Sequence, residues 1–202
     1  MKKVVIFGAT GTTGLCALSK AVEKGLEVTA FVRDEAKIPS DLKDKVEVAV
    51  GDVTNLEQVS QAVSGKDGVV VVLGTRNDLG PTTVLSDGMT NIVAAMKEHQ
   101  VEVTSVCLSA FLFYPPEKVP AIFKYLNGDH ERQFEITKQS GLKWIAVLPP
   151  HIADAPSSKY VIKYDESAGR AISKFDLGAF LVESLSQPEH YQKVCGIANA
   201  PQ

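Results

Sequence analysis

The segment Ile6-Phe7-Gly8-Ala9-Thr10-Gly11-Thr12-Thr13-Gly14 decides how the rest of the chain is interpreted. It follows an apolar β-branched run and precedes a stretch with helical spacing, so its G-x-x-G-x-x-G pattern stands between a strand and a helix. In that context Gly8 permits a tight turn, Gly11 lets the backbone approach a pyrophosphate, and Gly14 allows the helix to pack closely on the sheet. Free N–H groups at the start of the helix would bind the anion. The segment therefore predicts a dinucleotide-binding turn.

The end of the second apolar run indicates which dinucleotide is bound. NAD enzymes carry an acidic residue there, about 20 positions past the glycines, to bind the ribose 2′-hydroxyl. This chain has Arg33 at that point, a planar charged group suited to a phosphate, and Lys37 adds a second positive charge. The pair favours NADP(H). Asp34 leaves the alternative open, because its carboxylate could bind the ribose of NAD(H) instead.

Apolar runs that alternate with helix-like segments determine the fold class. Six such runs predict parallel strands at Val4–Phe7, Val28–Val32, Val46–Val50, Val69–Leu73, Val103–Leu108 and Trp144–Leu148. Helical spacing predicts helices at Leu15–Lys24, Leu56–Val63, Thr83–His99 and Ile122–Gln139. The pattern is typical of an α/β protein with a single Rossmann-type, doubly wound parallel sheet that has helices on both faces.

The pattern changes after Pro149-Pro150 into a short irregular tail. Within it we expect one strand at Tyr160–Tyr164 and one helix from about Phe175 to Ser186, begun by a capping box of Ser173 and Asp176. So short a tail leaves no room for a separate substrate domain. We therefore expect one domain over residues 1–202, with a small, open substrate site formed by loops 74–82, 109–120 and 149–174.

Composition excludes several kinds of partner. The 202 residues carry a net charge of -3 without a basic block, which argues against nucleic acid and membrane surfaces. The N-terminal apolar run is too short for a signal peptide, and three cysteines without a C-x-x-C pair favour a reducing cytoplasm. The four histidines have no metal-ligand spacing, so no metal is assigned.

The ends of the third and fourth strands add candidate contacts, because ligands bind at the carboxyl ends of parallel strands. Asp52 can accept a hydrogen bond from the adenine amino group, with Val53 against the ring. Asp52 could also cap the helix that begins at Leu56. Gly74 would keep the backbone clear of the cofactor.

Motifs along nearly the whole chain resemble the atypical short-chain dehydrogenase/reductases, and most closely the family of biliverdin-IXβ reductase and flavin reductase (NADPH). The matching segments are Ile6–Leu15, Val32–Asp34, Val50–Val53, Leu73–Leu79, Pro81–Val84, Asn91–Lys97, Ser109–Leu112, Lys118–Pro120, Pro149–Ile152 and Ile172–Gly178. The chain departs from the mammalian pattern at Lys37, at Leu85 and in the loop Phe113–Glu117, which borders the substrate site in the family.

The resemblance implies a monomeric enzyme that passes hydride from NADPH to flavins such as FMN and riboflavin, to linear tetrapyrroles such as biliverdin-IXβ, and to quinones. It places cofactor contacts at Gly8, Thr10, Gly11, Thr13, Arg33, Asp52, Val53, Leu73, Gly74, Arg76, Leu85, Cys107, Leu108, His130, His151 and Ile152. Taken alone, His130 could be an ordinary surface histidine on a helix.

The expected chemistry needs no dedicated proton donor. Tyr114 and Lys118 match the Tyr-x-x-x-Lys spacing of most short-chain dehydrogenases, but Pro115 and Pro116 between them disfavour the helix that the pair requires. The enzyme would instead hold a conjugated ring against the nicotinamide, and the acceptor would take its proton from water.

Two residues are the candidates for the catalytic site. Ser109 is the expected hydrogen-bond donor to substrate or nicotinamide, although its hydroxyl could instead cap the strand end. His151 is expected to form a wall beside the nicotinamide ribose, and a proton-donor role for its imidazole is the alternative. The missing Tyr/Lys pair leaves a second function open, a regulatory protein of the NmrA type that senses NADP(H) without turnover.

Overall fold

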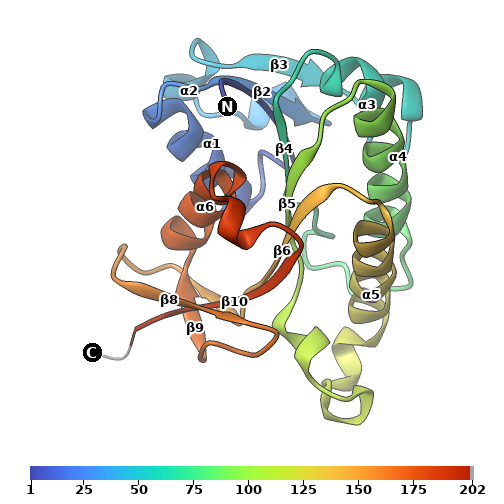
Figure 1. Ribbon diagram of the computed structural model, residues 1–202, viewed down its shortest axis with the longest axis vertical. Coiled ribbons are helices and arrows are strands. Elements are labelled where there is room, and N and C mark those ends of the chain that lie inside the picture. Colours follow the sequence, from blue (N-terminus) through green and yellow to red (C-terminus); the bar gives the residue numbers. More distant parts are fainter. Residues whose placement is uncertain (201–202) are drawn as a thin grey trace.

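The computed structural model describes residues 1–200, which form a central sheet in the strand order β3-β2-β1-β4-β5-β6-β10-β8 (Figure 1). Every pair of neighbouring strands is parallel except β10 and β8. The strands are β1 (Lys3–Phe7), β2 (Glu27–Val32), β3 (Glu47–Val50), β4 (Gly68–Val71), β5 (Val103–Cys107), β6 (Lys143–Leu148), β8 (Tyr160–Tyr164) and β10 (Lys193–Asn199). The order reverses between β1 and β4, which is the switch point where ligands bind in such sheets.

Helices cover both faces of this sheet (Figure 1). Residues of α1 and α6 pack in the core on one face, and residues of α3, α4 and α5 pack in the core on the other. The helices are α1 (Thr12–Glu23), α2 (Ser40–Lys43), α3 (Leu56–Val63), α4 (Val84–Glu98), α5 (Lys124–Gln139) and α6 (Lys174–Glu183). Residues 1–200 also contain the short 3-10 helices η1 (Glu35–Lys37), η2 (Ala110–Phe113), η3 (Pro116–Lys118), η4 (Ala121–Phe123), η5 (Ser184–Ser186) and η6 (Pro188–His190).

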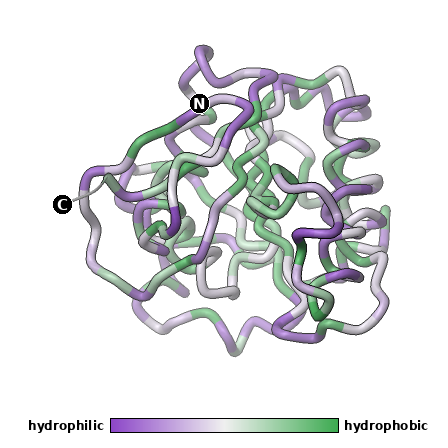
Figure 2. Tube along the Cα trace, turned by 90° about the horizontal axis from the view of Figure 1, so that it is seen from below, coloured by the Kyte–Doolittle hydropathy of each residue, from purple (hydrophilic) through white to green (hydrophobic). Residues whose placement is uncertain are grey.

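This arrangement confirms the predicted α/β fold with a doubly wound parallel sheet. The hydrophobic segments gather in the interior, between more hydrophilic outer segments (Figure 2). Within residues 1–200, no helix combines the length and the apolar character that a membrane crossing requires.

The tail after Pro150 is more regular than predicted. The strand at Tyr160–Tyr164 is confirmed as β8, but the sequence prediction missed β10, which lies between β6 and β8 in the main sheet. It also missed a small parallel sheet of β7 (His151–Ala153) and β9 (Ala171–Ser173). These strands are short or contain polar residues and glycine, so their apolar pattern is weak.

The predicted capping box at α6 is half right. Ser173 does cap the helix, since its Oγ accepts a hydrogen bond from the Phe175 N–H at 3.2 Å. Asp176 does not complete the box, because its Oδ2 accepts instead from the Ser158 N–H and from Asn199 Nδ2. The carboxylate thus ties three distant segments together.

Candidate dinucleotide site

Two glycines of the turn after β1 are required by the fold itself. Gly8 has φ +82°, and a Cβ at this position would overlap the Val72 carbonyl. A Cβ on Gly14 would overlap the Gly8 carbonyl oxygen. The close neighbour of Gly14 is therefore the backbone of the turn rather than the sheet, which corrects the reason expected from the sequence.

The other two glycines at this edge have no such reason inside the protein. Gly11 has φ −75° and ψ 167°, a conformation open to any residue, and a Cβ there would come no closer than 3.4 Å to the Gly8 oxygen. A Cβ on Gly74 would meet nothing within 4 Å. The room left at both positions suits a ligand that lies against the backbone.

The start of α1 is open to an anion. Gly11 is the N-cap residue, no side chain caps the helix, and its first turn carries no acidic residue. Thr10 is half-buried, and its Oγ1 lies 3.5 Å from Arg76 Nη2. Thr13 is buried, so its hydroxyl has little exposed surface. The residues around the turn thus fit a pyrophosphate held by backbone N–H groups.

At the end of β2, Arg33 and Asp34 are the two charged residues that could determine the cofactor, and they differ in their partners within the protein. The Asp34 carboxylate accepts from the Ala36 N–H at 3.0 Å and lies 3.9 Å from Lys37 Nζ. Arg33 is exposed and makes no side-chain hydrogen bond or ion pair within residues 1–200. Its guanidinium is therefore available for a phosphate, whereas Asp34 is already bound.

Asp52 follows β3 in a local turn. Its Oδ1 accepts from the N–H and the hydroxyl of Thr54 at 2.8 and 2.7 Å. The alternative role of Asp52 as a helix cap is wrong, because Asn55 caps α3. The hydrogen bonds from Thr54 lower the pKa of Asp52, and the charge of Arg33 contributes. Val53 is buried, so its side chain belongs largely to the core.

The loop after β4 bends sharply at two residues with positive φ, Arg76 at 53° and Asn77 at 69°. The Thr75 hydroxyl donates to the Asp78 carbonyl, which stabilises the bend. Leu73, just before the loop, is half-buried. The bend directs Arg76 back to Thr10 and so joins the end of β4 to the glycine turn.

Ser109 and His151 lie in two loops that contact each other at the ends of β5 and β6. The Ala110 N–H donates to the Pro149 carbonyl at 3.0 Å, which fixes the two loops to each other. Ser109 Oγ accepts from the Phe111 N–H at 3.2 Å and caps η2, so the capping role weighed from the sequence is present. Within residues 1–200 the hydroxyl hydrogen donates to no group, and it remains available. His151 and Ile152 are exposed in β7.

Four other residues expected at the cofactor lie deeper. Cys107 and Leu108 are buried at the end of β5, and burial raises the pKa of the Cys107 thiol to about 12. Leu85 has no exposed surface. His130 is also buried, which corrects the alternative of a surface histidine. Its Nδ1 lies 3.2 Å from Gln133 Oε1 and acts as the donor, and burial lowers its pKa.

A buried carboxylate that sequence reasoning missed lies next to His130. Asp129 on α5 has no exposed surface, and its oxygens accept from the N–H groups of Leu85 and Ser86 at 2.9 and 3.3 Å. The Ser86 hydroxyl and Arg132 Nη2 also donate to Asp129 Oδ1. Asp129 therefore caps α4 from a neighbouring helix. The sequence offered only an Asp-His pair on a polar helix as a signal.

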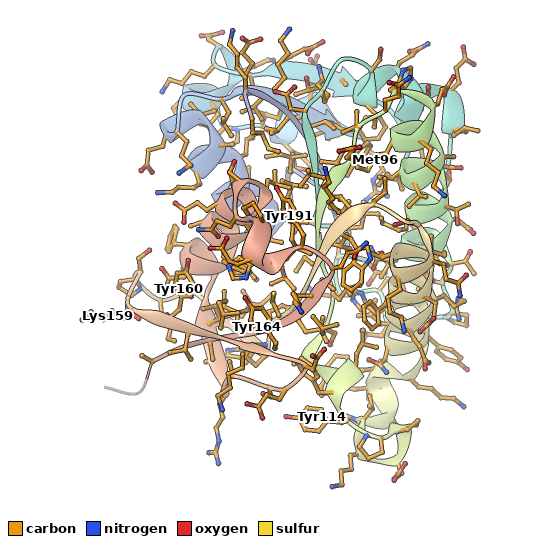
Figure 3. All side chains as sticks on the ribbon, viewed as in Figure 1. Met96, Tyr114, Lys159, Tyr160, Tyr164 and Tyr191 are labelled. Atoms are coloured by element: carbon orange, nitrogen blue, oxygen red, sulfur yellow. The ribbon has the colours of Figure 1, made fainter. Side chains whose placement is uncertain are left out.

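The Tyr-x-x-x-Lys spacing does not form a catalytic pair. Tyr114 and Pro115 have extended backbone after η2, and Lys118 ends the separate helix η3. Tyr114 is exposed in a loop, whereas Tyr160, Tyr164 and Tyr191 belong to the C-terminal region around β8, β10 and α6 (Figure 3). Within residues 1–200, Tyr114 and Lys118 do not share a helix.

Two hollows in the surface lie beside α5. Two shallow grooves of about 730 and 740 Å³ run between α4 and α5, and both are lined by Gly128 and Arg132. Neither is lined by the glycine turn. The predicted site is instead the open carboxyl edge of the sheet, where the loops after β1, β2, β3 and β4 meet.

Known proteins resemble this chain over most of its length. The family model described as NAD(P)H-binding matches residues 8–188. An uncharacterized chloroplastic protein of Arabidopsis thaliana is 28% identical over 99% of this chain and 79% of its own length.

Solved structures share the fold at lower identity. A short-chain dehydrogenase/reductase from Veillonella parvula, solved in complex with NADP, has a TM-score of 0.82 and 16% identity over 98% of this chain and 94% of its own. An oxidoreductase from Lactococcus lactis has a TM-score of 0.83 and 19% identity over 99% and 92%.

Proposed function

This chain belongs to the NAD(P)H-binding family, and we propose that it is an NADPH-dependent reductase that transfers hydride to flavins, biliverdin-IXβ and related conjugated acceptors such as quinones. It acts as a monomer in the cytoplasm. The observation that carries the proposal is the pair of loops at Ser109 and His151. Among the described residues, one hydroxyl hydrogen is available there, and Tyr114 and Lys118 do not share a helix. Such a site suits acceptors that need alignment and little acid catalysis.

The preference for NADPH rests on the end of β2. Arg33 is exposed and unpaired among the described residues, and a guanidinium binds a phosphate through two parallel hydrogen bonds. Asp34, which would favour NAD(H), is bound to Ala36 and Lys37. The charges at this point therefore favour the 2′-phosphate.

The residues divide the work of binding and alignment. When bound, the cofactor supplies hydride from its nicotinamide ring. Ser109 donates its free hydroxyl hydrogen to the substrate or the nicotinamide amide, and His151 forms a wall beside the ribose. The proton comes from water, because the site is open and a conjugated ring accepts hydride without prior protonation.

A panel of acceptors tests the proposal. NADPH absorbance is followed with FMN, riboflavin, biliverdin isomers and a quinone, and we expect oxidation with at least the flavins. Ser109→Ala should lower kcat/KM by about two- to tenfold and leave NADPH affinity unchanged, as the loss of one hydrogen bond implies. Tight NADPH binding without oxidation by any acceptor would favour the NADP(H)-sensing protein instead.

His151 separates alignment from acid catalysis. His151→Ala should weaken NADPH binding and leave the shape of the pH profile of FMN reduction between about pH 6 and 8 unchanged. A limb near the pKa of imidazole that disappears in this variant, with NADPH binding intact, would identify His151 as a general acid and contradict the alignment mechanism.

A further inference from the structure

Helices α1 and α6 lie side by side and run in the same direction (Figure 1). They pack tightly at Gly178, where a Cβ would come within 2.7 Å of Cys16 Cβ and the Ala17 nitrogen. Further along, Glu183 Oε1 of α6 lies 3.7 and 3.6 Å from the amines of Lys20 and Lys24 of α1. The order of these contacts shows that the two helices are parallel.

This register places the first residue of α6 beside the first turn of α1. Lys174 precedes Gly178 by one helical turn, as Thr12 precedes Cys16. Burial raises the pKa of the Cys16 thiol, and the positive charge of Lys174 opposes that rise, as expected of an ammonium near these turns. Lys174 therefore lies at the same end of this helix pair as the unpaired N–H groups of α1.

The backbone at Lys174 is held firmly. The Ser173 N–H donates to Asn199 Oδ1 at 2.6 Å, and Asn199 Nδ2 donates to Asp176 Oδ2 at 2.7 Å. The Ser173 hydroxyl donates to the Ala155 carbonyl at 2.7 Å. Residues from β10 and from the loop after β7 thus fix the start of α6.

Among the described residues, the Lys174 side chain has one ion-pair partner, and this partner is replaceable. It is 20% exposed, and its Nζ lies 2.7 Å from Asp154 Oδ1 and 5.1 Å from the centre of the Phe175 ring. Asp154 is 81% exposed, so water stabilises its charge when the pair opens. Exchange of this partner for another anion has a small cost.

A further cation would add to what the glycine turn already has, which is backbone N–H groups and the nearby Arg76, whose Nη2 lies 3.5 Å from Thr10 Oγ1. Residues 8–14 contain no lysine or arginine, although the pyrophosphate of a dinucleotide carries two negative charges. We propose that Lys174 binds the pyrophosphate, exchanging the Asp154 carboxylate for a phosphate oxygen. The inference rests on the dinucleotide site of the proposed function. The two cationic residues then have different roles. Arg33 binds the 2′-phosphate, which only NADP(H) carries, and Lys174 binds the pyrophosphate, which NADP(H) and NAD(H) share.

Titrations of NADPH and NADH into the full chain test this division. Lys174→Gln should raise the Kd of both cofactors by the same factor, about tenfold, as loss of a charged hydrogen bond implies. Arg33→Ala should raise the Kd of NADPH alone. Lys163→Gln removes a lysine that is more exposed than Lys174 and pairs with Glu166 at 3.2 Å, and it should change neither value.

Two further outcomes decide the proposal. Lys174→Arg keeps the charge and should bind both cofactors within about threefold of wild type. Unchanged Kd values in Lys174→Gln, or a loss confined to NADPH, would overturn the assignment to the pyrophosphate. Because binding is measured without an acceptor, absence of reductase activity leaves this test intact, and a wild type that binds neither cofactor would instead contradict the proposed function.

Discussion

Helices α1 and α4 follow the neighbouring strands β1 and β4, so both begin at the same edge of the sheet, on either side of the switch point. Their N-terminal ends have opposite surroundings. At α1 no side chain caps the helix, and glycines border it. At α4 the N–H groups of Leu85 and Ser86 donate to the buried carboxylate of Asp129.

The difference shows two ways in which the unpaired N–H groups at the start of a helix find an acceptor. Every α-helix begins with N–H groups that lack partners within the helix, and burial without a partner is costly. At α4 the protein provides the anion from α5. At α1 the first N–H groups have no acceptor among the described residues, and we infer that the anion there is the pyrophosphate of the cofactor.

The largest loss of stability is expected from Gly14→Ala, which introduces a steric clash in the turn before α1. The new Cβ would overlap the Gly8 carbonyl oxygen, and backbone at this point cannot move without distorting β1 or α1. We expect the free energy of unfolding to fall by more than about 4 kcal/mol. Urea denaturation measures it, and a loss below about 1 kcal/mol would show that the turn relaxes easily.

Asp129→Ala should destabilise the protein, because it removes the acceptor at the start of α4. It leaves the Leu85 and Ser86 N–H groups without their acceptor and Arg132 without its carboxylate, which costs about 3 kcal/mol. NADPH affinity of the folded protein should not change. Glu131→Ala, an exposed acid on the same helix, is the matched control and should stay within about 0.5 kcal/mol of wild type.

Arg33→Ala tests the far end of the predicted cofactor site. Loss of the guanidinium should raise the Kd of NADPH about tenfold or more and leave the Kd of NADH nearly unchanged. Equal affinities for the two cofactors in the wild type would contradict the assigned preference. Titration of both cofactors into both proteins gives the answer.

The smallest effect is expected on the pH dependence of stability, from the buried His130 next to Asp129 on α5. Burial lowers the pKa of His130, and its hydrogen bond with Gln133 and the charge of Asp129 offset only part of that. The unfolded chain then binds the proton more readily, near the ordinary value of 6.5, so stability is full above this pH and is lost as the pH falls. Urea denaturation at about pH 7.5 and about pH 5.5 should show a flatter pH dependence in His130→Gln. An unchanged slope would contradict this assignment.

The sequence predicted the features that depend on local patterns. Helix α3 and strand β8 begin and end where the periodicity indicated, and the glycine turn stands between β1 and α1 as expected. Strand β10 was missed for two reasons. Gly196 and the polar residues at both ends weaken its apolar pattern, and its pairing with β6 is a long-range contact that a local pattern does not show.

The candidate site was predictable only in part, for the same reason. Arg33 and Ser109 follow strands and could be placed from the alternation alone. Asp129 and Lys174 owe their surroundings to helix packing between distant segments, α5 on α4 and α6 on α1, which no local pattern encodes. The burial of His130 likewise depends on which face of α5 meets the core.

The central claim is that the dinucleotide binds at the start of α1, and Gly11→Ala tests it most directly. The folded protein can accommodate the added methyl group, but the methyl group would clash with a pyrophosphate bound against the Gly11 backbone. Urea denaturation and NADPH titration are measured on the same variant. We predict a free energy of unfolding within about 1 kcal/mol of wild type and a Kd for NADPH raised at least about tenfold. An unchanged Kd in a stable Gly11→Ala protein would contradict the claim that the open end of α1 holds the dinucleotide.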